Sequence, residues 1–479
     1  MGEVLKPDLC VIGAGSAGLS VAAIAASFGV PVVLIERGRM GGDCLNVGCV
    51  PSKALIAAGD HRHGIREAAR FGIRQTDPAV DFGAVRGHVR DVIAEIAPND
   101  SVERFTAMGV RVVKAEARFT DPRTVVAGGV TVKARRFVLA TGSRPAAPPV
   151  PGLDTVRYLT NDTIFDLGEK PKRLLIVGGG PIGVEIAQAH RRLGTDVTLI
   201  EASDRILARE DPELAAVVER ALLRDGVDLR LGLAIERVER RPGGAAVVLR
   251  RGDRDEAIEG SHILVAAGRQ PTTEGLGLEA AGVKADRSGI HVDRGLRTTN
   301  RRVYAIGDCA TGGTEGYRFT HVSNYHAGLV IRSALFRLRV RVDNTAIPRV
   351  TYTDPELAAV GLSEEEARRA GKAIRVLRWP FSENDRAQAE RATEGHVKAV
   401  VTPRGQVLGC AIAGPSAGEL IVPWALAIKQ GLKVQDLAGL VFPYPTLSEV
   451  TKRAAVEFLR PKTQSPWARR LIGFARRFG

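Results

Sequence analysis

The stretch that decides the fold lies near the N-terminus and reads Asp8-Leu9-Cys10-Val11-Ile12-Gly13-Ala14-Gly15-Ser16-Ala17-Gly18. Its apolar residues indicate a buried strand, and the small residues after the glycines indicate a helix. A second apolar strand follows and ends at Glu36. A glycine-rich turn that joins a strand to a helix in this way is typical of a dinucleotide-binding βαβ unit.

The same design occurs again in residues 173–201. An apolar strand, the pattern G-x-G-x-x-G, a helix and a strand tipped by an acid follow each other in the same order. The first glycine precedes the acid by 23 positions in both copies, from 13 to 36 and from 178 to 201. A single G-x-G-x-x-G pattern is weak evidence by itself. Because both copies lie between an apolar strand and a helix and end in an acidic residue, the sequence predicts two Rossmann-like units in an α/β protein.

The three glycines of each copy have different roles. The first permits a tight turn, the second lets the backbone approach a pyrophosphate, and the third lets the helix pack on the strand. In that order they are Gly13, Gly15 and Gly18, and then Gly178, Gly180 and Gly183. Glu36 and Glu201 would bind ribose hydroxyls. Because Glu201 would repel a 2′-phosphate, the sequence favours NADH over NADPH.

Cys44 and Cys49 follow the first unit, with four residues between them. If this stretch begins a helix, the two sulfurs lie about one turn apart and can close a small disulfide. The helix N-terminus and nearby Lys53 would stabilise a thiolate. The pair is therefore expected to carry redox chemistry.

The two cysteines could instead bind zinc or form a structural disulfide. A structural zinc site needs four ligands, and His61 and His63 are the only candidates nearby, so we predict no metal. A structural disulfide suits a secreted protein, but the chain starts with no apolar secretory segment, and we expect a cytoplasmic location. The remaining cysteines, Cys10, Cys309 and Cys410, are expected to be buried small hydrophobes.

Length, charge and hydropathy indicate the number of domains and argue against a nucleic-acid-binding or membrane-spanning protein. The 479 residues predict two to four domains. The net charge of +14 suits nucleic acid, but the basic residues are scattered among acids and aromatic residues are sparse, so we expect no nucleic-acid partner. The sequence contains no run of 18 apolar residues, so no membrane span is predicted.

Four further motifs occur in order along the chain. They are Ala140-Thr141-Gly142-Ser143-Arg144-Pro145, Ala266-Ala267-Gly268-Arg269-Gln270-Pro271, Ala305-Ile306-Gly307-Asp308 and Tyr352-Thr353-Asp354-Pro355-Glu356-Leu357-Ala358-Ala359-Val360-Gly361. With them the chain resembles the pyridine nucleotide-disulfide oxidoreductase family, the group of dihydrolipoamide dehydrogenase, glutathione reductase and mercuric reductase. The resemblance implies that Gly142 and Asp308 help to bind FAD and that Gly268 helps to bind NAD.

The resemblance also implies the domains. An FAD-binding domain would comprise residues 1–149 and 272–345, and an NAD-binding domain residues 150–271. An α+β dimerisation domain would comprise residues 346–460, so a homodimer is expected, and residues 461–479 would form a basic amphipathic tail. Proline-rich stretches at 144–151 and 344–348 suit linkers between domains.

By the same resemblance, NADH would reduce FAD, and the electrons would pass to a Cys44–Cys49 disulfide, or the reverse. Cys49 would lie against the flavin, and Cys44 would exchange with a small-molecule or protein-bound disulfide. Lys53 resembles the lysine that binds near flavin N5, and Glu185 resembles its glutamate partner.

The chain departs from the family near its C-terminus. Dihydrolipoamide dehydrogenase and glutathione reductase carry His-Pro-x-x-x-Glu as an acid-base pair, but this chain has Tyr444 in place of the histidine and keeps Glu449. A tyrosine, with an ordinary pKa of about 10, is a poor proton shuttle at neutral pH, so dihydrolipoamide turnover should be slow. Tyr444 could equally be an interface tyrosine.

The tyrosine leaves three functions open. A dihydrolipoamide dehydrogenase-like disulfide reductase fits best, and a mercuric-reductase-like metal or quinone reductase is the alternative. Against that alternative, no cysteine follows Cys410 in this sequence, whereas mercuric reductase carries a pair of cysteines near its C-terminus. A non-enzymatic FAD-bound partner protein is the third.

The last stretch, residues 465–479, extends beyond the resemblance. Its aromatic and aliphatic residues are expected on one helical face, with paired arginines on the other side; they are Trp467, Leu471, Phe474 and Phe478. Such a tail could make a weak peripheral membrane or partner contact, or pack against its own dimer.

Overall fold

The protein is described from a computed structural model that covers residues 3–252, 254–313, 317–463 and 465–478. The chain forms two compact units. Unit 1 comprises Met1–Gly178, Arg192–Asp196 and Ile235–Asn344, and unit 2 comprises Gly179–Arg191, Val197–Ala234 and Thr345–Gly479.

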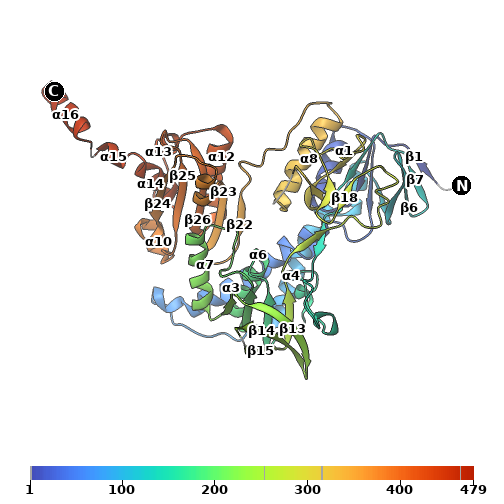
Figure 1. The fold of residues 1–479 in the computed structure, drawn as a ribbon, viewed down its shortest axis with the longest axis horizontal. Helices are drawn as coiled ribbons and strands as arrows, with labels where there is room; N and C mark the ends of the chain where they lie inside the picture. Colours follow the sequence, from blue (N-terminus) through green and yellow to red (C-terminus); the bar gives the residue numbers. More distant parts are fainter. Residues whose placement is uncertain (1–2, 253, 314–316, 464, 479) are drawn as a thin grey trace. The chain divides into compact units, whose positions relative to one another are not determined.

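A five-stranded parallel sheet forms the centre of unit 1 (Figure 1). Its strand order is β20 (Val303–Ala305), β8 (Arg136–Leu139), β2 (Leu9–Ile12), β3 (Val32–Glu36) and β4 (Arg111–Lys114). All four residues of β2 are buried, because both faces of the sheet are covered. This is the first predicted dinucleotide-binding unit.

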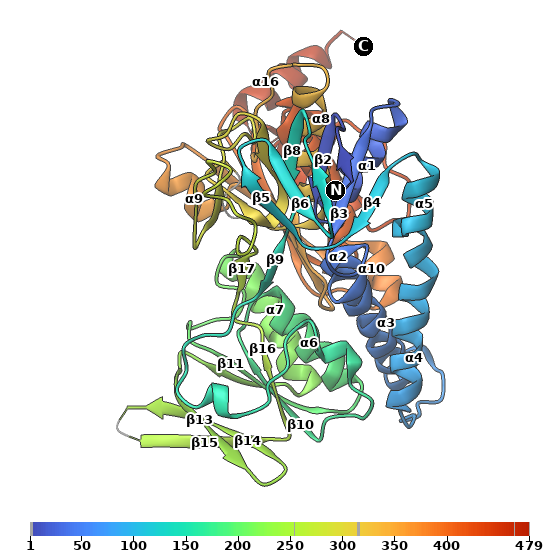
Figure 2. The ribbon, with the colours of Figure 1, turned by 90° about the vertical axis from the view of Figure 1, so that its right-hand side faces the viewer.

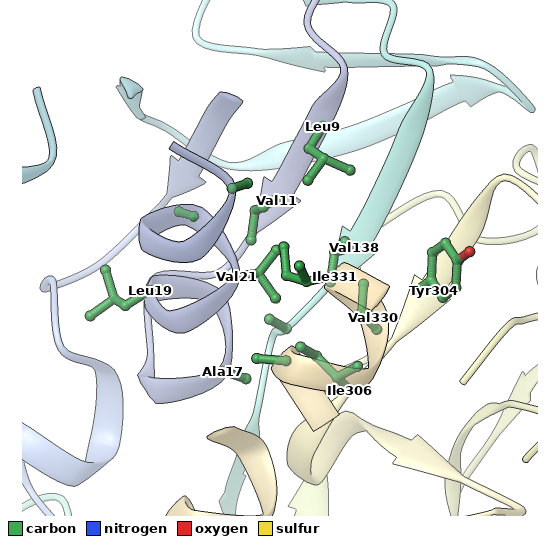
Figure 3. Close-up of a cluster of buried hydrophobic side chains, with 14 of the residues drawn as sticks. Leu9, Val11, Ala17, Leu19, Val21, Val138, Tyr304, Ile306, Val330 and Ile331 are labelled. Carbon is green, nitrogen blue, oxygen red and sulfur yellow. The ribbon is translucent and has the colours of Figure 1, made fainter. Parts of the chain in front are cut away.

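Helices α1 (Ser16–Ser27) and α8 (Thr320–Ala334) lie side by side on one face of this sheet. Figure 3 shows Val11 and Val138 of the strands among side chains of the two helices, including Val21 and Ile331. Burying each of these side chains contributes roughly 1.5–3 kcal/mol to stability. The core holds α1, and with it the glycine turn, against β2.

A smaller sheet covers the other face, in the order β1 (Val4–Leu5), β7 (Val130–Val132), β6 (Thr124–Ala127) and β5 (Ala117–Asp121). Cys10 and Phe137 point into this second core, whereas their strand neighbours Val11 and Val138 point into the first. The rings of Phe119 and Phe137 meet edge to face at 5.1 Å between centroids.

The remaining elements of unit 1 lead to the site. Helices α2 (Gly42–Asn46), α3 (Cys49–Arg66), α4 (Phe82–Ile96) and α5 (Val102–Ala107) follow β3, and α3 lies alongside α4 (Figure 2). Strands β9 (Ser143–Pro145) and β17 (Arg269–Pro271) form an antiparallel ribbon. A small sheet contains β18 (Ala285–Asp286), β19 (Gly289–His291) and β21 (Ala310–Thr311).

The second glycine motif also has the predicted element order. Strand β10 (Arg173–Val177) leads through the glycines into α6 (Pro181–Arg192) and β11 (Asp196–Glu201). In unit 1, β10 pairs in parallel with β16 (His262–Val265), and in unit 2, β11 pairs in parallel with β12 (Asp228–Leu231). Helix α7 (Pro212–Asp225) precedes β12, and β13 (Ala234–Arg241), β14 (Gly244–Arg251) and β15 (Arg254–Gly260) form a further sheet.

Unit 2 also contains a five-stranded antiparallel sheet. Its order is β22 (Arg349–Thr351), β23 (Glu356–Gly361), β26 (Val407–Gly414), β25 (His396–Val401) and β24 (Arg375–Pro380). The helices of this region are α9 (Glu364–Arg369), α10 (Asp385–Glu390), α11 (Ala417–Leu420), α12 (Val422–Gln430), α13 (Val434–Ala438), α14 (Glu449–Glu457), α15 (Arg460–Thr463) and α16 (Pro466–Ala475). This mixture agrees with the predicted α+β part. Among the described helices, none has the length and apolar character needed to cross a bilayer.

Candidate active site

The first glycine turn has the conformation that a dinucleotide needs. Gly13 has φ +104°, and a Cβ atom there would lie 2.3 Å from the carbonyl oxygen of Ala140. A Cβ on Gly18 would lie 1.8 Å from the carbonyl oxygen of Gly13, so helix and turn touch through bare backbone. Gly15 is the N-cap of α1, and no side chain among the described residues caps that helix end. Its N–H groups are available to an anion.

The second glycine turn, in residues 178–183, resembles the first. Gly178 has φ +114°, and its Cβ would lie 2.6 Å from the carbonyl oxygen of Ala266. A Cβ on Gly180 would meet no atom of the described residues within 4 Å, which leaves room for a close approach. Gly183 is buried in α6. Gly268, with φ +155°, lies just before β17.

The two acids occupy equivalent places in the two copies. Glu36 accepts hydrogen bonds from the N–H groups of Ala14 and Gly38, both at 2.6 Å. Glu201 accepts from the N–H groups of Gly179 at 2.6 Å and Ser203 at 2.8 Å. Each carboxylate is thus fixed beside its glycine turn, where a ribose would lie against it.

The cysteine stretch does not form the single helix that the sequence predicted. Cys44 lies in α2 and Cys49 is the first residue of α3, with a break at Val47 and Gly48. A Cβ on Gly48 would lie 2.9 Å from the carbonyl oxygen of Asp43, so only glycine lets the two helices turn this closely. The break places Cys49, rather than Cys44, at the N-terminus of the longer helix.

The two sulfurs are neighbours. Both residues carry thiols; Cys44 is half-buried and Cys49 is exposed. The adjacent Cys49 sulfur, with a contribution from burial, raises the pKa of the Cys44 thiol above its ordinary value. The Cys49 sulfur lies 3.3 Å from the hydroxyl of Thr320 at the start of α8. Cys49 lies at the N-terminus of the longer helix, α3, which favours a thiolate there.

Lys53 and Glu185 lie in different units of the structure, so their pairing stays a prediction. The Lys53 ammonium donates to the hydroxyl of Ser52 at 3.3 Å, one turn after Cys49. Glu185 is buried in α6 and accepts from the N–H group of Tyr352 at 3.0 Å.

Gly142 lies shortly after strand β8, and Asp308 lies shortly after the neighbouring strand β20. The Ser143 hydroxyl donates to the Asp308 carboxylate at 2.6 Å. Gly142 has φ +66°, and its carbonyl accepts from the N–H group of Thr272 at 3.0 Å. These contacts hold the Asp308 turn against the start of β9.

Tyr444 is exposed, and its hydroxyl donates to the Asp385 carboxylate at 2.9 Å. That hydrogen bond, with the nearby charge of Glu449, raises the pKa of Tyr444 above its ordinary value. Glu449 begins α14.

The remaining cysteines are buried, as predicted. Burial raises the pKa of the thiols of Cys10, Cys309 and Cys410. In the described part of the chain, no three or more His, Cys, Asp or Glu side chains gather as metal ligands.

Comparison with known proteins identifies the family. The family model described as pyridine nucleotide-disulphide oxidoreductase matches residues 7–327, and the model of that family's dimerisation domain matches residues 347–455. The chain belongs to the pyridine nucleotide-disulphide oxidoreductase family. The resemblance drawn from the motifs is therefore confirmed.

Individual relatives match over nearly their whole length. The mercuric reductase of Streptomyces lividans is 39% identical over 459 residues, 94% of this chain and 96% of that protein. The dihydrolipoyl dehydrogenase of Thermus scotoductus is 38% identical over 460 residues, again 94% and 96%. The solved Cu(II) complex of the HOCl-induced flavoprotein disulfide reductase RclA from Escherichia coli has a TM-score of 0.83 and 28% identity, and the match covers 93% of this chain and 98% of that one.

As a pyridine nucleotide-disulphide oxidoreductase, the chain is an FAD-dependent enzyme that uses NAD(P)H, and its dimerisation domain indicates a homodimer. The residues present fit two dinucleotides. Both glycine turns are cradles that a Cβ would fill, and α1 offers uncapped N–H groups to a pyrophosphate. The predicted fold class and cofactors are thus confirmed.

Sequence reasoning missed Arg269 in the site. Its Nε atom donates to the Ser143 hydroxyl at 2.7 Å and lies 3.9 Å from the Asp308 carboxylate, and its Nη2 atom forms an ion pair with Asp43. The motif at residues 266–271 predicts a role for Gly268 but none for Arg269. The available signal was an arginine directly after that glycine, among small residues.

Proposed function

We propose that this chain is an NADH-dependent disulfide reductase whose exchangeable disulfide is Cys44–Cys49, acting in either direction on a small-molecule or protein-bound disulfide. When bound, FAD supplies the chemistry that joins a hydride donor to a disulfide. The adjacency of the two sulfurs, with Cys49 at a helix N-terminus, carries the proposal. Such a dithiol suits a reducing compartment, so we infer a cytoplasmic location.

The residues that would hold the cofactors fall into two groups. The FAD group is Gly13, Gly15, Gly18, Glu36, Lys53, Gly142 and Asp308, and the NAD group is Gly178, Gly180, Gly183, Glu201 and Gly268. The fixed carboxylate of Glu201 supports NADH over NADPH, because it would repel a 2′-phosphate.

The thiol chemistry follows from the sulfur pair. Once its thiol has lost a proton to solvent, Cys44 attacks a substrate disulfide as the thiolate, so a mixed disulfide forms and one substrate thiolate leaves. The Cys49 thiolate then attacks the Cys44 sulfur, which forms the Cys44–Cys49 disulfide and releases the second substrate thiolate. Two electrons pass from the dithiol to the substrate, and two protons end on the released thiols.

Proton transfer in this exchange is where the chain differs from its dihydrolipoyl dehydrogenase relatives. Tyr444 holds its proton at neutral pH, because its hydrogen bond to Asp385 raises an already high pKa. Glu449 keeps its place but lacks a histidine to orient. Dihydrolipoamide is therefore a poor substrate, and disulfides with acidic leaving thiols are better ones.

A second candidate is reduction of mercuric thiolates or quinones. Tyr444 and the similarity to proteins named mercuric reductase favour it. The absence of any cysteine after Cys410 argues against a dedicated mercury enzyme.

A substrate panel tests the proposal. NADH oxidation is measured with lipoamide, glutathione disulfide, an aromatic disulfide, mercuric thiolates and a quinone, for wild type and Cys44→Ser. The proposal predicts disulfide turnover that Cys44→Ser abolishes. Quinone turnover that survives Cys44→Ser would favour the second candidate. No rate above the oxygen blank would favour a non-enzymatic FAD-bound partner protein.

We infer that the domains divide as the motifs indicate, into 1–149 with 272–345, 150–271, 346–460 and the tail at 461–479. The gap between the two family matches, at residues 328–346, supports the boundary at 345. Limited proteolysis that cuts first near residues 344–348 would agree with it.

We propose that α16 binds an anionic membrane surface weakly. Residues 460–479 contain basic but no acidic residues, and the side chains of Trp467, Leu471 and Phe474 are exposed. Sedimentation with vesicles should show salt-sensitive binding to anionic but not zwitterionic lipid, which Leu471→Glu weakens. A tail that packs on its own dimer would instead give no binding and a weaker dimer in Leu471→Glu.

A further inference from the structure

Two side chains connect the redox loop, residues 43–49, to chain segments far away in sequence. The Arg269 guanidinium forms an ion pair with Asp43, the residue before Cys44. Its Nη1 atom donates to the side-chain oxygen of Asn161 at 3.1 Å. The Asn161 amide in turn donates to the carbonyl oxygen of Val47 at 3.3 Å, in the break that precedes Cys49. All these residues belong to unit 1.

The guanidinium is itself held in one orientation. Its Nε atom donates to the Ser143 hydroxyl at 2.7 Å, and its Nη2 atom donates to the Ser143 carbonyl at 3.0 Å. Asn161 is 9% exposed, and the Arg269 side chain is 20% exposed. The Asp43 side chain is 48% exposed, whereas the hydrogen bonds of Asn161 are buried and costly to break, because water replaces them poorly.

We propose that Arg269 and Asn161 are positioning residues that clamp both ends of the redox loop and so hold the Cys44 and Cys49 sulfurs together. The proposal rests on the proposed function only in taking these sulfurs as the exchanging pair. Residues 161 and 269 lie near the two ends of the segment proposed to bind NAD, 150–271. The clamp therefore joins both connections of that segment to the sulfur pair.

The clamp should raise the effective concentration of one sulfur toward the other, which is measured against glutathione. Oxidation by glutathione disulfide converts the two thiols into the Cys44–Cys49 disulfide and releases two glutathione molecules, so electrons and protons balance. The equilibrium favours the disulfide more strongly when the loop is already ordered in the dithiol form. Without the clamp the dithiol gains freedom that the disulfide must give up, and the equilibrium shifts toward the dithiol.

The experiment equilibrates the flavin-loaded protein with glutathione buffers, without NADH, and measures the thiols of Cys44 and Cys49 by mass spectrometry after acid quench. Asn161→Asp keeps the acceptor for Arg269 but loses the amide that donates to the Val47 carbonyl and to the Asp162 carboxylate. Arg269→Gln loses the ion pair with Asp43. Each should lower the effective concentration about tenfold, and the double variant should fall by less than the product of the two.

Arg144→Gln is the matched control, because Arg144 lies on β9 of the same ribbon and pairs with Glu274 at 2.9 Å. It should behave as wild type. If Arg269→Gln does not fold, Arg269→Lys serves instead, because a lysine lacks the planar guanidinium that bridges Asp43 and Asn161. Effective concentrations within twofold of wild type in Asn161→Asp and in the folded Arg269 variant would overturn the clamp. Because no NADH is used, this result stands apart from failure of the proposed function, which appears as sulfurs that NADH cannot reduce.

Discussion

At the scale of single residues, Tyr444 is the basis of the slow dihydrolipoamide turnover that we propose. Its hydroxyl is bound to the Asp385 carboxylate, and the raised pKa keeps the proton on tyrosine throughout the neutral range. A histidine at this place would titrate near neutral pH and could exchange a proton with a thiol. The difference between tyrosine and histidine can be measured directly.

Tyr444→His should raise kcat/KM for dihydrolipoamide oxidation by at least about tenfold, since positioned acid-base groups contribute 10²–10⁴-fold. The pH profile should gain a limb near the histidine pKa, about 6.5. Tyr444→Phe removes the hydroxyl without supplying a base and should leave the slow rate unchanged. A large loss of rate in Tyr444→Phe would show that the tyrosine itself transfers the proton.

Single residues also show what the sequence could and could not predict. The glycines, Glu36, Glu201 and the cysteine pair were predictable because their spacing within about 30 residues expresses local geometry. Arg269 and Asn161 were not, because their contact joins positions 108 residues apart. Nothing in the spacing of residues along the chain reports a side-chain contact of that kind.

At the scale of elements, each glycine turn combines a residue that the fold needs with one that we propose binds the dinucleotide. Gly178 is confined by its positive φ and the nearby Ala266 carbonyl, whereas a Cβ on Gly180 would meet open space within the described residues. The two positions should therefore respond differently to the same added methyl group.

Gly180→Ala should fold with an unchanged Tm and bound FAD, but its KM for NADH should rise about tenfold, because the methyl occupies the approach of the pyrophosphate. Gly178→Ala should lower the Tm, because it forces a positive φ and a backbone clash. Thermal denaturation and steady-state kinetics of both variants check this. A normal KM in Gly180→Ala would contradict the assignment of this turn to NADH.

In the redox loop the sequence predicted the wrong element. Helical residues after Lys53 predicted one helix through both cysteines, but Gly48 divides it into α2 and α3. Gly48 indicates a helix break in the sequence, because glycine has a low helix propensity. Its effect depends on the close approach of the Asp43 carbonyl, a contact that only the folded chain defines.

At the scale of the whole molecule, a buried charge cluster in unit 2 connects α7 to the antiparallel sheet. Lys398, 5% exposed, contacts the carboxylates of Asp211 at 2.8 Å, Glu213 at 2.9 Å and Glu364 at 3.1 Å. The hydrogen bond from Arg378, followed by that from Lys398, lowers the pKa of Glu213 from 4.5 to about 2. We therefore expect this cluster to make the stability of the protein depend on pH.

Because the folded pKa of Glu213 is depressed, its contribution to stability is complete above pH 4.5 and is lost as the pH falls toward about 2. The difference in free energy of unfolding between wild type and Glu213→Gln should therefore be constant above pH 4.5 and shrink below it. Urea denaturation across this range measures it. Glu365→Gln, which breaks an exposed pair with Arg369, is the control and should have a small effect. A difference that grows on acidification would contradict the assignment.

The central claim is that reduced nicotinamide delivers electrons to the Cys44–Cys49 pair. The most direct measurement is an anaerobic NADH titration of the purified flavoprotein, followed by absorption and by alkylation of each cysteine. In wild type, both sulfurs should become alkylatable, and a long-wavelength band from a thiolate beside oxidised flavin should appear. In Cys49→Ser the band should be absent. Flavin that bleaches while both cysteines stay oxidised, or a band that Cys49→Ser retains, would contradict the account.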